Sequence, residues 1–414
     1  MTDNDAKGAS INLPGGFHFN QVKGIPEERL KTPLDFAPPL GLLTQFTGTF
    51  AGKGFNLIFR PQSAATPTPL PRPAQGPSDN ILELNLTSET LAFSPPLGSV
   101  PNRGMVQGDV FLNGVPYVQT VADITNGAPV AIHFEPGIWL AVPTTTNPAE
   151  PLTFVRMASI PHGTTINLQG TASATIAGPP NIPSVDPTPF LSGPRTPIAF
   201  PSQTAGNVAT FRIPQDLSAQ ILAGTITQAI LNDPNTVLRN AIVGQNIVET
   251  VVIEVASAPE APVVLPIPAA GGGTANIAFL TGTESANTPN AEVPRQQPAP
   301  GGRVFAGVKS TFWIETVEHV ITLPPFHPGQ GPVTLPGDPP SALGVDAPRF
   351  TLHPPFPIPR PTKIRVRSTQ IQYSQVVLLN FNGLTWPHVS VATLVPSTPI
   401  IPPPSVWTAL QKHP

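Results

Sequence analysis

The sequence predicts an all-β protein built from consecutive antiparallel strands. Short segments alternate apolar and polar residues with a period of two, and turn residues separate these segments closely. The 59 prolines among 414 residues fit long loops between strands, because proline cannot donate within a sheet. With 40% hydrophobic residues and 21 Phe, the chain can build a sizeable core, which excludes a disordered protein. An up-and-down barrel and a sandwich both satisfy this pattern.

The first half of the chain accounts for most of this pattern. Gln45–Arg60 alternates aromatic and branched residues with glycines, which predicts a strand that bends sharply. Asn113-Gly114 predicts a hairpin turn between two apolar runs. The period-two segments that follow the first strand are Ile81–Phe93, Met105–Asp123, Val130–Val142, Leu152–Ile160 and Thr164–Ala172.

The second half mixes strands with proline-rich stretches. Asn207–Ile213 has strand character, and Pro214–Asn232 is the best helix candidate, since its apolar residues recur near helical spacing and Asp233-Pro234 would end it. Residues 323–361 are dense in proline and predict a loop. The remaining expected strands are Asn246–Ala256, Thr274–Thr281, Val308–Val317, Ile364–Asn380 and Trp386–Val395.

Composition excludes several classes of function. A net charge of −3 and a pI near 6.2 give no electrostatic footprint for nucleic acid. Zero cysteines exclude disulfides, cysteine nucleophiles and thiolate metal or haem ligands. The polar N-terminus lacks the features of a signal peptide, and no apolar run reaches about 18 residues, so we expect a cytoplasmic protein without a membrane span. The motifs of hydrolases, zinc proteases and dinucleotide enzymes are absent.

The most informative candidate residue is a histidine in the last expected strand. His388, Ser390, Ala392 and Leu394 share one face of that strand. If this mostly small face points into a barrel, it leaves unfilled volume beside the imidazole, and a bound ligand is expected there. The alternative is a hydrogen-bonded histidine on the solvent side of a strand end.

Two further histidines are candidates. His133 and Glu135 lie two positions apart and project from one side of a strand, so the carboxylate could fix the imidazole tautomer, or the two could form an exposed pair of little consequence. His162 lies in a turn between two expected strands and could reach over a barrel mouth, or it could be a solvated turn residue.

Three segments together resemble the calycin superfamily, and within it the haem-binding barrels called nitrobindins. They are the opening strand Leu43–Gly54, the stretch Ile132–Trp139 with its histidine-x-glutamate-x-glycine pattern, and the closing hairpin Gln372–Leu394. The resemblance implies a calycin-like antiparallel barrel that binds haem b, with His388 as axial metal ligand. Ser390 and Ala392 would then border the porphyrin.

The resemblance also implies a reaction. His133 and His162 become the distal, catalytic candidates, and the haem would act on a diatomic or peroxide species, as in a peroxynitrite isomerase, or oxidise a small apolar substrate as a peroxidase or oxygenase does. Two alternatives remain. A haem-free barrel could carry a fatty acid or other lipophile hydrogen-bonded by His388, or a solidly packed barrel could meet partners through its proline loops.

We expect one elaborated barrel and not two domains. The expected organisation is a lead-in segment at 1–40, the first part of the barrel at 41–172, an insertion with a helix at 173–247, the remaining strands at 248–396 with the proline-rich loop 323–361, and a tail at 397–414.

Overall fold

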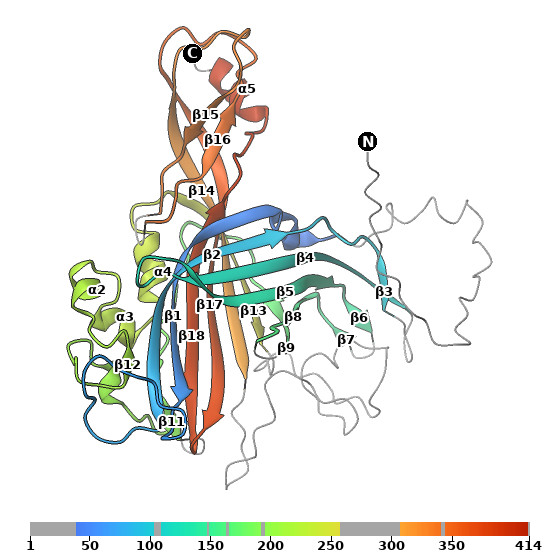
Figure 1. The fold of residues 1–414 in the computed structure, drawn as a ribbon. Coiled ribbons are helices and arrows are strands. Elements are labelled where there is room, and N and C mark those ends of the chain that lie inside the picture. Colours follow the sequence, from blue (N-terminus) through green and yellow to red (C-terminus); the bar gives the residue numbers. More distant parts are fainter. Residues whose placement is uncertain are drawn as a thin grey trace, which may run out of the picture.

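The computed structural model describes residues 39–102, 109–146, 149–162, 165–191, 195–256, 307–340 and 344–412. Strands dominate these residues, which confirms the all-β prediction (Figure 1). The expected strand Thr274–Thr281 and nearly all of the lead-in segment lie outside the described residues.

Ten long strands close into a ring in which every neighbouring pair is antiparallel. The ring is completed by the pairing of β2 with β4, so the strands of the ring leave no free edge between them. In ring order the strands are β2 (Asn80–Phe93), β1 (Gly48–Pro61), β18 (Leu384–Pro396), β17 (Thr362–Phe381), β14 (Val308–Leu323), β13 (Ile247–Ala256), β9 (Thr165–Ala172), β8 (Thr153–Ser159), β5 (Val130–Val142) and β4 (Val110–Asp123).

Apolar side chains fill one end of the ring interior. The 3-10 helix η1 (Gly41–Gln45) precedes β1 and buries Leu43 in this cluster, where the next residue after the helix, Phe46, is buried as well. The Phe46 ring stacks on Phe93 at 4.8 Å and meets Trp139 edge-on at 5.5 Å between ring centroids. This end of the ring is therefore closed. We call the opposite end, toward which the half-buried His388 and His133 lie, the open end.

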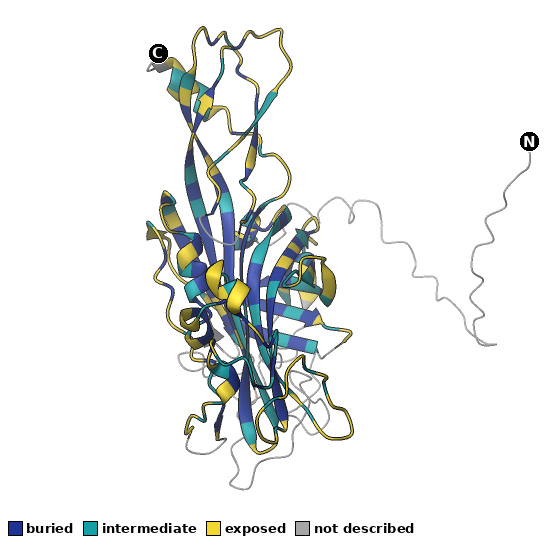
Figure 2. Cartoon of the chain, turned by 60° about the vertical axis from the view of Figure 1, so that its left-hand side comes forward, coloured by how far each residue is buried: buried dark blue, intermediate teal, exposed yellow. Residues whose placement is uncertain are grey.

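A second apolar layer covers the outside of β1, β2 and β18. The segment after β9 provides it, with buried Leu217, Ile226, Ile230, Val237 and Leu238 packing on outward-facing residues of those strands. Figure 1 shows its short helices along one flank of the ring, and Figure 2 shows that their outer surfaces are exposed. We call this segment, residues 173–246, the outer layer.

The remaining elements are short. β3 (Val100–Asn102), β10 (Ile176–Ala177), β11 (Phe190–Leu191) and β12 (Arg212–Ile213) add to strands of the ring, while β6 (Thr145–Thr146) pairs only with β7 (Ala149–Glu150). The helices are η2 (Pro201–Gln203), α2 (Ser218–Leu222), α3 (Gln228–Asn232), α4 (Thr236–Ala241) and α5 (Ser405–Lys412). In the described part of the chain, none of the helices combines the length and the apolar character needed to cross a bilayer.

The expected hairpin at Asn113-Gly114 is wrong. β4 runs straight through both residues, and Gly114 pairs with Leu140 on β5. A Cβ atom at Gly114 would come within 2.4 Å of the carbonyl oxygen of Trp139. The glycine therefore serves a close approach of two strands and not a turn.

The single helix expected over Pro214–Asn232 is also wrong. Two helices of one to two turns, α2 and α3, replace it. Gly224 between them has a φ of +69°, the left-handed conformation that ends a helix. The strand expected at Asn207–Ile213 is reduced to the two residues of β12.

The proline-dense residues 323–361 contain more structure than the predicted loop. β15 (Val333–Pro336) and β16 (Arg349–Leu352) form a small antiparallel sheet there. Beyond the ring, the ends of β14 and β17 extend to this sheet and share with it a separate apolar cluster, against which α5 packs (Figure 1).

Candidate functional site

Polar side chains gather at the open end of the ring. Alternation along β18 places His388, Ser390 and Ala392 on the inward face, and Ala392 is fully buried in the inner apolar cluster. β5 brings His133 and Glu135 to the same end from across the ring, where His133 influences the pKa of His388. Residues far apart in sequence therefore meet in one interior.

His388 is held by a hydrogen bond to the neighbouring strand β1. Its Nε2 lies 2.7 Å from Asn56 Oδ1, which also accepts a hydrogen bond of 3.2 Å from Ser390 Oγ. A carboxamide oxygen only accepts, so Nε2 carries the proton and Nδ1 keeps a lone pair. Asn56 Nδ2 in turn donates to Asn85 Oδ1 on β2 at 3.3 Å, which fixes the amide orientation.

The His388 imidazole is kept neutral. Burial within the ring lowers the pKa of His388 to about 4, and the neighbouring His133 contributes in the same direction. The residue as a whole is half-buried and not fully enclosed. At neutral pH the ring is therefore an uncharged hydrogen-bonding group that a small ligand can reach.

His133 is oriented by a carboxylate. Its Nε2 lies 3.1 Å from Glu135 Oε2, so the shared side of β5 expected from their spacing is found. The ring of His162, in the turn after β8, meets His133 edge-on at 5.0 Å between centroids. Partial desolvation and the nearby His133 lower the pKa of His162, although the residue as a whole is exposed. The structure thus places the two histidines that we expected on the distal side in contact with each other.

Glu135 belongs to a buried ionic network. Its Oε1 accepts hydrogen bonds from Arg156 Nη2 at 2.6 Å and from the Tyr117 hydroxyl at 2.5 Å. Burial opposes ionisation, but the Arg156 charge and the hydrogen bonds from His133 and Tyr117 bring the pKa of Glu135 down to about 2. The carboxylate is therefore ionised and can only accept.

Arg156 uses its whole guanidinium in this network. Its Nε donates to the Tyr117 hydroxyl at 2.8 Å, and Nη1 donates to Gln375 Oε1 at 2.7 Å and to Ser310 Oγ at 3.3 Å. The paired Glu135 keeps the pKa of Arg156 above its ordinary value despite burial. The cation links strands on both sides of the ring and is not available to an anionic ligand.

A second carboxyl, Glu89 on β2, lies beside this network. It accepts hydrogen bonds from Thr87 Oγ1 at 2.7 Å, from Gln119 Nε2 at 3.2 Å and from the Tyr373 hydroxyl. Burial nevertheless raises the pKa of Glu89. No arginine or lysine side chain forms an ion pair with it in the described part of the chain, which is why it differs from Glu135.

This arrangement has two chemical capabilities. An imidazole that donates Nε2–H to an ionised carboxylate keeps a basic Nδ1, so His133 can accept a proton from a group placed beside it. The neutral His388 can accept, at Nδ1, a hydrogen bond from the polar end of a ligand, because its Nε2–H is already donated to Asn56. The described residues hold no group of three or more His, Asp or Glu side chains arranged for a metal ion.

The residues beside His388 do not fit a porphyrin as they are packed. The small face expected to leave room for it is filled at Ala392, which is fully buried among the side chains of the inner apolar cluster. The Nε2 of His388 is bonded to Asn56, which leaves only Nδ1 with a free lone pair. Haem binding therefore stays a prediction from the resemblance.

The sequence analysis missed Arg156, Tyr117, Glu89 and Asn56. A signal for Arg156 was present, since it shares one face of an expected strand with the apolar Phe154 and Ala158. A charged residue on the apolar face of a predicted strand requires a buried partner. The identity of that partner depends on strand pairing, which local sequence does not specify.

Comparisons of this chain with protein-family models, with curated proteins and with solved structures gave no match. The geometry of the open end is therefore the basis on which a function can be proposed.

Proposed function

We propose that the open end of the ring binds a small amphipathic ligand, such as a fatty acid or a related lipophile, without haem. The observation that carries the proposal is the neutral His388, fixed by Asn56 and only half-buried. The Nδ1 of this neutral, oriented imidazole accepts a hydrogen bond from a hydroxyl or a protonated carboxyl head group without the cost of burying an unpaired charge.

The apolar part of the ligand has its own contacts. Val377 on β17 and Ile160 after β8 pack on the inner apolar cluster but stay partly exposed at this end. Val377 pairs directly with His388 across β17 and β18. A ligand whose head group reaches His388 would therefore cover Val377 with its first methylene groups, which gains about 0.8 kcal/mol for each methylene removed from water.

The direct test is titration with a fluorescent fatty acid such as dansylaminoundecanoic acid. We expect micromolar binding by the wild type and roughly tenfold weaker binding by His388→Leu, which loses one hydrogen bond to the head group. His327→Leu is the matched control, because His327 is an exposed histidine on the extension beyond the ring. Absence of binding by the wild type, or equal binding by His388→Leu, would reject the proposal.

Haem is distinguished by a separate measurement. The packing at Ala392 supports a protein that is colourless as purified and that shows no Soret band dependent on His388 when hemin is added. A Soret band that disappears in His388→Ala would instead support the haem expectation and require the side chains around Gly54 and Ala392 to move.

A further inference from the structure

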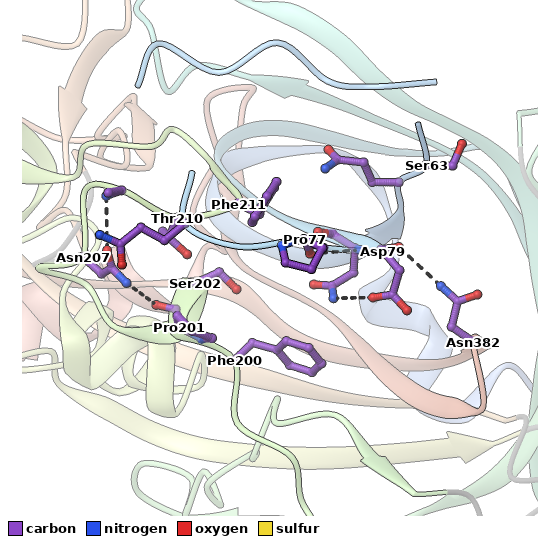
Figure 3. Close-up of a pocket in the computed structure, with 15 residues that line it drawn as sticks. Ser63, Pro77, Asp79, Phe200, Pro201, Ser202, Asn207, Thr210, Phe211 and Asn382 are labelled. Carbon is purple, nitrogen blue, oxygen red and sulfur yellow. Dashed lines mark hydrogen bonds between the residues drawn. The ribbon is translucent and has the colours of Figure 1, made fainter. Parts of the chain in front are cut away.

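A cavity of about 830 Å³ lies outside the ring, against the outer layer. Three segments line it: the connection from β1 to β2, residues 200–211 of the outer layer, and the turn between β17 and β18 at Asn382. Figure 3 shows side chains from all three directed toward one region. Its volume is within the range of pockets that hold small organic ligands.

One wall of the cavity is held by a buried arginine. Arg212 is fully buried, and its guanidinium forms no ion pair within the residues that the structure describes. It donates instead to backbone carbonyl oxygens around it, those of Ser202, Thr204, Ala205, Asn207, Pro214 and Gln215. A loop tied at six carbonyls is fixed before any ligand arrives, so the cavity is preorganised.

The lining combines aromatic rings with unused amide groups. Phe200 and Phe211 are both partly exposed and line the cavity. The side-chain amides of Gln62 and Gln75 have no hydrogen-bond partner among the described residues, and Oε1 of Gln62 is shielded from water as well. A buried amide oxygen without a partner costs free energy, and turning the half-buried Gln62 side chain toward a ligand hydroxyl in the cavity would relieve that cost.

The charge of the lining restricts the ligand further. Asp79 is the single charged side chain among the residues that line the cavity, and one of its oxygens accepts from Asn80 Nδ2 at 3.0 Å while the other has no partner in the described structure. No lysine or arginine lines the cavity to balance an anion. A carboxylate accepts hydrogen bonds from hydroxyl groups, and a side-chain amide both donates to hydroxyl groups and accepts from them.

We propose that this cavity binds an uncharged saccharide of one or two rings. A sugar ring presents a face of C–H groups, which stacks on the electron-rich face of Phe200 or Phe211, and a rim of hydroxyls for Gln62, Gln75 and Asp79. The proposal is independent of the ligand at the open end of the ring, because none of the residues that line the cavity belongs to that site.

A nearby tryptophan provides the readout. Trp386 is fully buried, and its ring lies 5.1 Å from that of Phe200, so a ligand that contacts Phe200 is expected to change the Trp386 fluorescence. The probes are maltose, cellobiose and N,N′-diacetylchitobiose, with adenosine as a flat aromatic competitor. Saturation-transfer NMR on the full chain measures the same binding without relying on the tryptophan.

We expect at least one of the three disaccharides to bind with a Kd of about a millimolar. Phe211→Ala and Gln62→Ala should each weaken it about tenfold, the loss expected when one aromatic or hydrogen-bonding contact is removed. Phe134→Ala is the matched control, since Phe134 is an exposed aromatic residue on β5. Thermal unfolding verifies that each variant is folded.

Two results would overturn the proposal. One is absence of binding of all three disaccharides up to about 20 mM, including the case in which adenosine alone binds. The other is disaccharide binding that Phe211→Ala and Gln62→Ala, both folded, leave unchanged.

Discussion

Glu135 inside the ring and Glu315 beneath the outer layer are equally inaccessible, with exposed fractions of 1% and 0%. At pH 7, however, Glu135 is ionised and Glu315 is mostly neutral. Arg156, Tyr117 and His133 surround Glu135, and its pKa falls to about 2. Glu315, on the outward face of β14, receives one hydrogen bond from Gln370, and burial raises its pKa to about 8. Burial sets the penalty for charge, and the partners decide whether the carboxyl ionises.

The contrast extends to the two regions. The buried polar groups described above at the open end of the ring, those of Glu135, Arg156, Tyr117 and Glu89, all have hydrogen-bond partners. Outside the ring, buried side-chain oxygens without a partner remain, among them those of Gln169, Asn235, Glu315 and Gln372. Strand pairing determines which side chains meet inside the ring, because every second residue of each strand points inward. The outer layer contacts the ring mainly through apolar packing, and such packing does not specify which polar groups pair.

Removing the positive charge of Arg156 tests this difference between the two carboxyls most strongly. Arg156→Met leaves Glu135 buried without its counter-charge, and we expect a loss of about 3–5 kcal/mol in the free energy of unfolding, measured with urea. Lys309→Met is the control, because its ion pair with Glu254 is exposed and should contribute less than about 1 kcal/mol. Equal losses for the two variants would show that burial does not distinguish the pairs.

The outer carboxyl gives an effect of opposite sign. A raised folded-state pKa means that the stabilisation by Glu315 is complete below pH 4.5 and is lost as the pH rises toward about 8. Glu315→Gln removes this loss, so the variant should exceed the wild type by about 3 kcal/mol in unfolding free energy at pH 7 and match it near pH 4. A variant less stable than the wild type at pH 7 would mean that the carboxylate is ionised and compensated.

His388 provides a third test, in which the stability of the protein is measured at acidic pH. Its lowered folded-state pKa leaves the stabilisation complete above pH 6.5 and removes it as the pH falls toward 4. Between pH 7 and pH 4.5 the unfolding free energy should fall by about 2–3 kcal/mol more in the wild type than in His388→Gln. Parallel pH profiles for the two proteins would place the imidazole in contact with bulk water.

The smallest effect on the unfolding free energy is expected for the exposed His162. His162 touches His133 from an exposed turn, so His162→Ala should change the unfolding free energy by no more than about 0.5 kcal/mol. Binding of the fluorescent fatty acid by the same variant then reports on the role of His162 in ligand contact alone. A large loss of stability would show that the network of the open end extends to this turn.

Much of the ring could be predicted because its strands alternate in local sequence. The predicted segment Val130–Val142 coincides with β5, and the faces that carry His388 and His133 are those expected from the pleat. The errors at Asn113-Gly114 and at 214–232 arose where neighbouring strands or a left-handed glycine decided the conformation. The partners of Glu135 could not be predicted, since Tyr117 and Arg156 reach it only through the register of three strands.

The pairing of β1 with β18 joins residues such as Gly54 and Ala392, which are separated by most of the chain. During synthesis, β1 emerges from the ribosome long before the segment that will cover its second edge. Contacts of such long sequence separation form slowly, and an uncovered strand edge invites association with other chains in the interval. We therefore expect refolding from urea to be slow and its yield to fall with protein concentration.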